Sequence, residues 1–316
     1  WRLRELPLTP ERVRAALNPL PAPPPLKENR RTASAKRSRL RFAWPLAGAF
    51  SGAVAVGAGI FPFNAAIAPV ARPLPDVFSP ATIERGRLAA AAGACNVCHV
   101  GANGTPFAGG RALETPFGVV YATNITPDEA AGIGTWSYPA FARAMRQGVA
   151  RDGHHLYPAH PYTSFAKASE ADLQALYAYL MAQAPVRQQT PDNALRFPFN
   201  LRPLVAGWNA LFHDNRPFKP DPAKSAQWNR GFYLVESLGH CSACHSPRNA
   251  LGAEQRNAYR AGGFSEVWEA PPLSSISHAP IPWSEDVLFA YLRTGHLRYP
   301  GVSGGPWEAF VRAVKC

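Results

Sequence analysis

The sequence predicts an all-α protein built from two tandem copies of one domain, placed after an N-terminal transmembrane helix. Two observations favour this fold: a Cys-x-x-Cys-His motif that occurs twice in matching surroundings, and a long uncharged apolar segment that follows a basic region. A third is that neither copy shows a sustained alternation of apolar and polar residues, which a half-buried strand would require. With 316 residues, 47% of them hydrophobic, the chain is long enough for two or three domains with cores of their own.

The duplication is visible as matched residues at matched spacings. Each copy has an Arg-Gly pair, a Gly-x-Cys-x-x-Cys-His run, and a Trp-Ser pair whose tryptophan precedes a glycine by 12 residues. From the first cysteine to that glycine there are 53 positions in one copy and 54 in the other. This agreement indicates a first repeat over residues 79–185 and a second over 225–316, joined by a linker over 186–224. The matched residues are Arg85-Gly86, Gly93, Cys95, Trp136-Ser137 and Gly148, against Arg230-Gly231, Gly239, Cys241, Trp283-Ser284 and Gly295.

Two helices of the first repeat can be placed by their start signals. Ser79 followed by Pro80 is typical of a helix N-cap with proline at the first helical position. Ser169 can cap a second helix, with Asp172 in its first turn. That helix carries apolar residues at positions i, i+3, i+4 and i+7, which predict a buried face. They are Leu173, Leu176, Tyr177 and Leu180.

The basic charge of the chain is concentrated before the repeats. Residues 1–72 hold 12 Lys or Arg and 3 Asp or Glu, while the remainder holds 21 and 18, within a net charge of +12. The Pro-rich segment 1–41 has no apolar pattern for a core, and a nucleic-acid-binding role is disfavoured because an apolar segment follows at once. No nucleic-acid partner is therefore expected.

That apolar segment, residues 42–63, has the roughly 20 residues that a membrane-spanning helix needs. The basic residues before it favour a cytoplasmic N-terminus, which places both repeats outside the cytoplasm. A cleaved signal peptide ending near 66–68 is the alternative.

Each Cys-x-x-Cys-His motif predicts a covalent attachment site for haem c. The two cysteines form thioether bonds to the vinyl groups, and the adjacent histidine becomes an axial ligand of the iron. A shared zinc site is disfavoured because the two cysteine pairs are 146 residues apart, against roughly 15–20 in a compact site. A redox dithiol does not explain the histidine that follows each pair. The sequence thus predicts two haem c groups, attached through Cys95 and Cys98 with His99, and through Cys241 and Cys244 with His245.

The sixth ligand of the first iron has to come from elsewhere in the chain. The two methionines, Met145 and Met181, both fall in apolar helical patterns and are expected in the core. His160, in a proline-flanked loop, is the preferred ligand of the first haem, with His154 and His155 as alternatives.

The second repeat leaves its sixth ligand more open. Trp307 occupies the position that corresponds to His160, and tryptophan cannot bind iron. His296 is the preferred candidate, His278 is an alternative, and a five-coordinate iron is another. Cys316, the last residue, receives no role.

Several further stretches resemble the membrane-bound multihaem cytochrome c subunits of bacterial dehydrogenases. These subunits serve quinoprotein alcohol dehydrogenases and molybdenum hydroxylases that act on aldehydes or on N-heterocycles such as nicotinate. The resemblance covers about residues 79–316 and leaves the segment 1–41 outside it. It is carried by ATNITPD at 122–128, GIGTWS at 132–137, RQGV at 146–149, DGHHLYPA at 152–159, GHC at 239–241, YLRTG at 291–295 and GGP at 304–306.

The resemblance implies two cytochrome c domains and an electron-transfer subunit that is not itself an enzyme. It implies a dehydrogenase catalytic subunit as partner, quinone or another cytochrome as acceptor, and a place at the bacterial inner membrane with the haem domains on the periplasmic side. Members of the family often have methionine where His160 and Trp307 stand, and many carry a third haem domain that is not found in this sequence. Histidine in place of methionine at position 160 implies bis-histidine ligation of the first haem. Tryptophan in place of methionine at position 307 keeps a dihaem peroxidase-like enzyme as the alternative.

Overall fold

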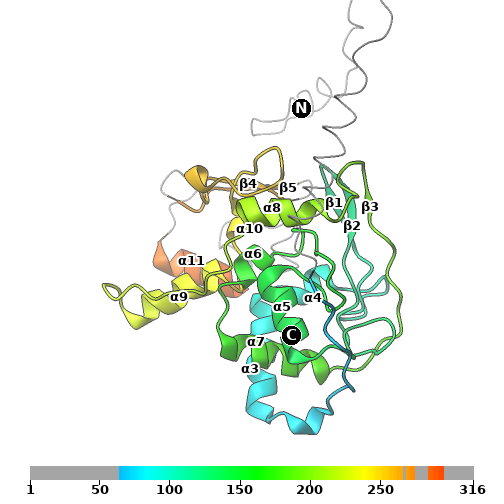
Figure 1. Cartoon of the computed structure of the whole chain (residues 1–316). Coiled ribbons are helices and arrows are strands. Elements are labelled where there is room, and N and C mark those ends of the chain that lie inside the picture. The colour runs from blue at the N-terminus through cyan, green and yellow to red at the C-terminus, as the bar shows by residue number, and fades with distance from the viewer. Residues whose placement is uncertain (1–63, 266–267, 275–283, 295–316) are drawn as a thin grey trace, which may run out of the picture. The chain divides into compact units, whose positions relative to one another are not determined.

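The computed structural model describes residues 64–265, 268–274 and 284–294, all within a compact unit that begins at Val56 (Figure 1). This part of the chain is mostly helical but also contains short strands, so the all-α prediction omitted two small sheets. No helix within these ranges is long and apolar enough to cross a membrane. The predictions that fall outside the described residues concern the segment 1–41, the anchor over 42–63, His278, His296, Trp307 and Cys316.

Helices α3 (Pro80–Ala92) and α7 (Glu170–Met181) form the main helix pair of the first repeat. Both begin as predicted: the Ser79 hydroxyl accepts a hydrogen bond from the Thr82 amide, and the Ser169 hydroxyl accepts one from the Asp172 amide, each at 3.1 Å. The helices approach so closely that a Cβ added at Gly86 would lie 1.9 Å from the Ala175 carbonyl oxygen. Glycine is therefore required at this crossing.

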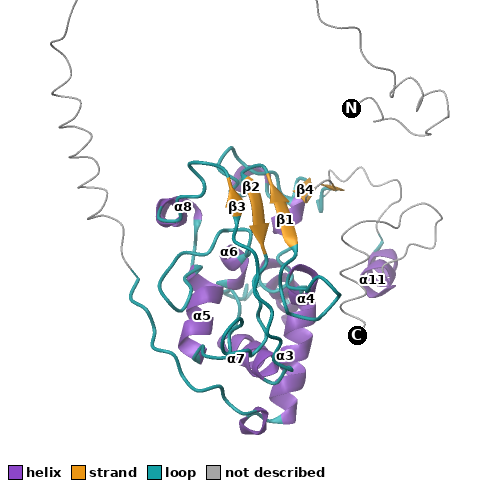
Figure 2. Ribbon diagram, turned by 90° about the vertical axis from the view of Figure 1, so that its right-hand side faces the viewer, coloured by secondary structure: helices purple, strands orange, loops and turns teal. Residues whose placement is uncertain are grey.

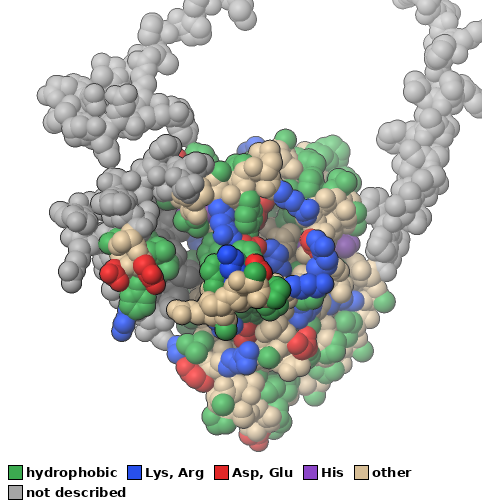
Figure 3. Space-filling model, turned by 90° about the vertical axis from the view of Figure 1, so that its left-hand side faces the viewer, with side chains coloured by type: hydrophobic (Ala, Val, Ile, Leu, Met, Phe, Trp, Pro, Cys, Tyr) green, Lys and Arg blue, Asp and Glu red, His purple; other side chains and the backbone are tan. Residues whose placement is uncertain are grey.

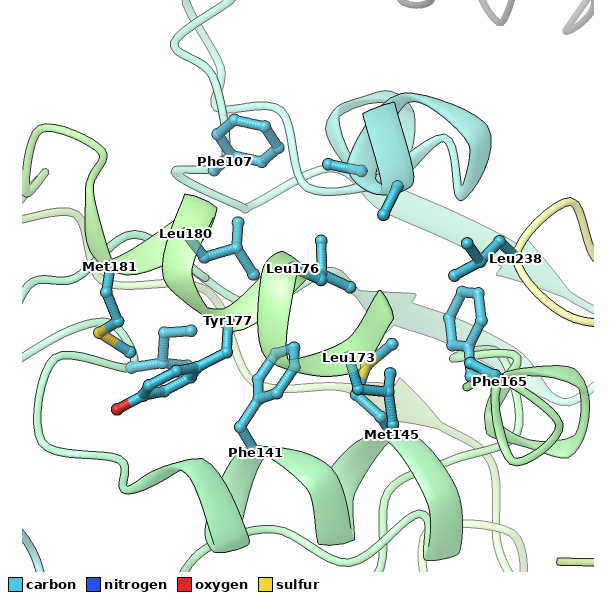
Figure 4. Packing of buried hydrophobic residues seen from close by; sticks show 14 residues of the cluster. Phe107, Phe141, Met145, Phe165, Leu173, Leu176, Tyr177, Leu180, Met181 and Leu238 are labelled. Atoms are coloured by element: carbon cyan, nitrogen blue, oxygen red, sulfur yellow. The ribbon is translucent and has the colours of Figure 1, made fainter. Parts of the chain in front are cut away.

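Helix α5 (Tyr138–Gln147) packs across α7 and closes the core. It ends at Gly148, whose left-handed φ of 63° terminates the helix without a steric penalty. Figure 4 shows Phe141 and Met145 of α5 pointing toward α7. Met145 is 6% exposed and Met181 is fully buried, so both methionines lie in the core as predicted. Around them pack Ala89, Ala90, Phe107, Ile133, Phe165, Leu173, Leu176, Tyr177, Leu180 and Leu238.

A three-stranded antiparallel sheet follows the first cysteine motif (Figure 2). Strands β1 (Ala112–Thr115) and β2 (Gly118–Tyr121) form a hairpin in which Leu113 pairs with Val120. The third strand, β3 (Ala194–Leu195), comes from the predicted linker and pairs with β2. The linker thus adds a strand to the first repeat.

The second repeat begins with α9 (Ala226–Glu236), capped by the Ser225 hydroxyl, which accepts a hydrogen bond from the Trp228 amide at 3.1 Å. It also contains a two-stranded sheet, β4 (Gly263–Ser265) and β5 (Trp268–Ala270). The division of the chain into two repeated domains stays a prediction. The remaining elements are η1 (Pro75–Val77), α4 (Cys95–Cys98), α6 (Tyr162–Phe165), α8 (Leu204–Phe212), α10 (Ser242–His245), η2 (Arg256–Ala258) and α11 (Glu285–Thr294).

Two buried carboxylates join the repeats. Asp172 of the first repeat accepts hydrogen bonds from the Tyr233 hydroxyl of the second repeat at 2.6 Å and from Arg85 Nε at 2.8 Å. Glu236 of the second repeat pairs with Lys167 Nζ of the first at 2.8 Å. Each repeat therefore supplies one carboxylate and receives a partner for it from the other, which satisfies charges that would be costly to bury alone.

The charges of these carboxylates are preserved by their partners. Burial favours a higher pKa for both Asp172 and Glu236, but the hydrogen bonds and cations around them outweigh it and hold each pKa below its ordinary value. Figure 3 shows one face of the molecule, where basic, acidic and apolar side chains are interspersed on the surface.

Candidate haem sites

The first cysteine motif forms one tight helical turn. Helix α4 carries Cys95 and Cys98, and the His99 amide donates to the Cys95 carbonyl at 2.9 Å. The turn is entered through Ala94, which has a left-handed φ of 49°. Residues 93–99 are called the first attachment loop below. A single turn places both sulfur atoms and the histidine on one side of the backbone, as attachment to one porphyrin edge requires.

The second cysteine motif repeats this geometry. The His245 amide donates to the Cys241 carbonyl at 3.0 Å, and His240, directly before Cys241, has a left-handed φ of 35°. Residues 239–245 are called the second attachment loop. The structure therefore brings together the three predicted site residues within each loop, in the same local arrangement.

Both motif histidines are oriented by a backbone carbonyl. Nδ1 of His99 lies 2.6 Å from the Thr123 oxygen, and Nδ1 of His245 lies 2.7 Å from the Pro271 oxygen. Because a carbonyl only accepts hydrogen bonds, Nδ1 carries the proton and Nε2 keeps a lone pair. A second ring nitrogen held in this way is the usual arrangement of a histidine that ligates a metal.

The short hairpins supply these two carbonyls, and sequence reasoning missed them. Thr123 follows β2, and Pro271 follows β5 directly. The backbone carbonyls of the two histidines are also held in the same way in both motifs. The His99 oxygen accepts a hydrogen bond from the Gly109 amide and the His245 oxygen accepts one from the Gly262 amide, both at 2.8 Å. Both glycines have a positive φ, and the glycines themselves were the signal available in the sequence.

The protonation states fit haem attachment. Burial lowers the pKa of His99 and of His245, and the carbonyl hydrogen bonds offset this only in part, so both rings are neutral at neutral pH. Burial also raises the pKa of the Cys95 thiol to about 12 and raises that of Cys241. A redox-active dithiol needs a lowered pKa, so these cysteines are poorly suited to that chemistry. The donor set in each loop fits haem c.

His160 is buried within electrostatic range of His99, the histidine of the first attachment loop. Burial lowers the pKa of His160 to about 3, and the nearby rings of His99 and His240 add to the effect. The Phe165 ring is 5.4 Å from its ring centre. A neutral histidine close to His99 is suited to be the second axial ligand of the same iron.

The two alternatives to His160 are engaged elsewhere. Nδ1 of His154 lies 2.6 Å from an Asp152 carboxylate oxygen, in an exposed pair. Nε2 of His155 is 3.3 Å from the Asn64 side-chain amide. The electrostatic surroundings of His160 include His99, whereas those of His155 are dominated by burial and His154.

The amino-acid sequence of the chain is similar to those of several known proteins. No family model matches the chain. It is 55% identical over 314 residues to a subunit of the nicotinate dehydrogenase of Pseudomonas putida, a match that covers 96% of this chain and 26% of that protein. It is 41% identical over 241 residues to the gluconate 2-dehydrogenase cytochrome c subunit of Pantoea cypripedii, covering 73% of this chain and 55% of that one.

A third relative is matched over most of its own length. The chain is 34% identical over 245 residues to a dihaem cytochrome c-type protein of Cereibacter sphaeroides, and the match covers 75% of this chain and 82% of that protein. By contrast, the chain spans about a quarter of the length of the nicotinate dehydrogenase subunit and about half that of the gluconate dehydrogenase subunit.

Proposed function

Because the chain belongs to the family of c-type cytochromes that includes the cytochrome subunits of dehydrogenases, we propose that it carries two haem c groups and passes electrons from a partner dehydrogenase to a respiratory acceptor. These names confirm the resemblance drawn from the motifs. The observation that carries the proposal is the pair of matching attachment loops, each with a neutral histidine held by a carbonyl at Nδ1.

The chain's own residues have three roles toward the cofactor. Cys95 and Cys98 in one loop and Cys241 and Cys244 in the other would hold the porphyrins by thioether bonds. The carbonyls on His99 and His245 fix the ring orientation and raise the basicity of each ligand nitrogen. Haem c bound there supplies reversible one-electron exchange at the iron. The surrounding core of the first repeat, with Phe165 and Leu238, limits the access of water.

His160 would supply the second histidine ligand of the first haem iron in this proposal. Its pKa of about 3 keeps it neutral and able to donate a lone pair at any physiological pH. Two histidines give a lower potential than the histidine–methionine pair that is common in cytochromes c. In the second repeat His296 is the candidate ligand, on sequence grounds alone.

The partner we propose is the catalytic part of a nicotinate dehydrogenase. Its support is the relative at 55% identity, against 34% to 41% for the other dehydrogenase cytochrome subunits and the dihaem cytochrome. The acceptor is quinone or another cytochrome. We further propose that residues 42–63 anchor the protein in the bacterial inner membrane, with the haem-bearing repeats in the periplasm.

The axial assignment is tested by optical and EPR spectra of the haem-loaded protein with His160→Ala, and with His154→Ala as the matched control. His160→Ala is expected to convert one of two low-spin ferric haems to high spin, because it removes one axial nitrogen. His154→Ala leaves both low-spin, since His154 pairs with Asp152. Two low-spin haems in His160→Ala would refute the ligand assignment.

The electron-transfer role is tested by mixing the haem-loaded protein with the catalytic part of a nicotinate dehydrogenase. Nicotinate is expected to reduce both haems only when that catalytic part is present, and a quinone analogue is expected to reoxidise them. Oxidation of nicotinate by the cytochrome alone, or turnover with peroxide alone, would favour an enzymatic role instead, the second outcome pointing to a dihaem peroxidase.

A further inference from the structure

One side chain connects the two attachment loops. Nε2 of His240 lies 3.2 Å from the carbonyl oxygen of Gly93, a contact between residues 147 positions apart. Because the carbonyl only accepts, the His240 ring donates this hydrogen bond. His240 directly precedes Cys241, and Gly93 stands two residues before Cys95. The hydrogen bond thus links the backbone segments that lead into the first cysteine of each motif.

The left-handed turn that His240 occupies does not by itself require a histidine. Its counterpart in the first attachment loop is Ala94, which enters the same turn with a left-handed φ of 49° against 35° for His240. A left-handed conformation is uncommon for residues other than glycine, so both loops hold this strain in place. Alanine meets the requirement in one loop, and the histidine side chain in the other therefore has a separate task.

The surroundings of His240 suit a permanent contact between the loops. Its ring centre is 5.5 Å from that of Phe165, in an edge-on arrangement. Burial lowers the pKa of His240, so the ring stays a neutral donor. Leu238, just before the second loop, is 2% exposed and belongs to the core of the first repeat. A Cβ added at Gly93 would lie 3.3 Å from Cys95 Sγ, so the segment that His240 contacts has little room to shift.

We propose that His240 is a positioning residue that fixes the two attachment loops against each other and thereby sets the distance and angle between the two haem groups. This inference rests on the proposed function, because it needs a haem on each loop. Exchange of one electron between a ferrous and a ferric iron takes no electron and no proton from His240, so the hydrogen bond persists throughout. The role of His240 is geometric. Loss of its hydrogen bond is expected to change the distance and angle between the two haems and to leave the properties of each single haem as they are.

The test uses the full-length haem-loaded protein and circular dichroism in the Soret region, where two haems at fixed separation give a split signal. His240→Ala is expected to reduce this splitting severalfold and to slow electron equilibration between the haems severalfold after rapid reduction, while the absorption spectrum of each haem stays unchanged. His240→Gln, whose amide N–H can donate to Gly93, is expected to restore part of both. His154→Ala is the matched histidine control and leaves both as they are.

The outcomes separate this inference from the proposed function. Fewer than two haems on the unmodified protein would contradict the proposed function itself. Two haems with equal splitting and equal equilibration rate in His240→Ala and the unmodified protein would overturn the role of His240. If His240→Ala fails to attach the second haem, His240→Gln decides: attachment with the split signal supports the proposal, and attachment without it overturns the proposal.

Discussion

In the first repeat, the helix before the attachment loop crosses α7 so closely that Gly86 has no room for a side chain. In the second repeat, the corresponding Gly231 of α9 is exposed, and no described atom lies within 4 Å of a Cβ placed there. The same Arg-Gly pair therefore stands in two different environments. Sequence repetition preserved the attachment loop, whereas the support around it differs between the described parts of the repeats.

The support in the first repeat is an apolar core, and Leu238 is the member of that core that the second repeat contributes. The second repeat is tied to the first by polar contacts: the Asp172 and Glu236 clusters and the His240 ring. The hydrophobic effect is non-directional, whereas hydrogen bonds have preferred distances and angles. We infer that the first repeat provides stability and that the polar contacts set the placement of the second attachment loop.

The largest expected difference between the repeats comes from adding one methyl group to each glycine. Gly86→Ala is expected to lower the free energy of unfolding by about 3 kcal/mol or more, because the new Cβ meets the Ala175 backbone. Gly231→Ala is its matched control and is expected to raise it by about 0.5–1 kcal/mol, since alanine is favoured in an exposed helix interior. Urea denaturation of the two variants checks this. Equal losses at both positions would contradict the asymmetry.

The two buried carboxylates at the contact between the repeats are expected to differ in their contribution to stability. Glu236→Ala leaves Lys167 and Arg260 without their anion, and their side chains are only 31% and 22% exposed, so we expect a loss of about 3–5 kcal/mol. Asp172→Ala leaves Arg85, which is 52% exposed and can be hydrated, so we expect a loss of about 1–3 kcal/mol. Thermal unfolding of both variants would show which substitution costs more stability. A larger loss in Asp172→Ala than in Glu236→Ala would contradict this expectation.

The smallest expected effect is on acid stability. In the folded protein the pKa of Asp172 and of Glu236 lies below its ordinary value, so the unfolded chain binds protons first as the pH falls. Their contribution is complete above about pH 4 and is lost as the pH falls from there through the folded pKa. Asp172→Asn combined with Glu236→Gln is expected to flatten the stability curve below about pH 4. An unchanged slope would mean that the pKa of each carboxylate is the same in the folded and the unfolded chain, which would contradict the account.

Sequence reasoning located the caps at Ser79 and Ser169 and the core methionines, because each is encoded by local pattern or spacing, and the haem attachment sites stay a prediction. It missed the hairpins that hold His99 and His245, since strands of three or four residues leave almost no periodicity to detect. It also missed the role of His240, because that role depends on a contact across 147 positions, which no local pattern can encode.

Attachment of one haem at each loop underlies both proposals, and the mass of the intact purified protein tests it directly. We predict a mass increase of two haem groups over the apoprotein. The increase should fall to that of one haem group in the double variant Cys95→Ala/Cys98→Ala. It should fall in the same way in the double variant Cys241→Ala/Cys244→Ala. A single haem on the unmodified protein, or a cysteine-pair variant that still carries two, would contradict the assignment of one haem to each loop.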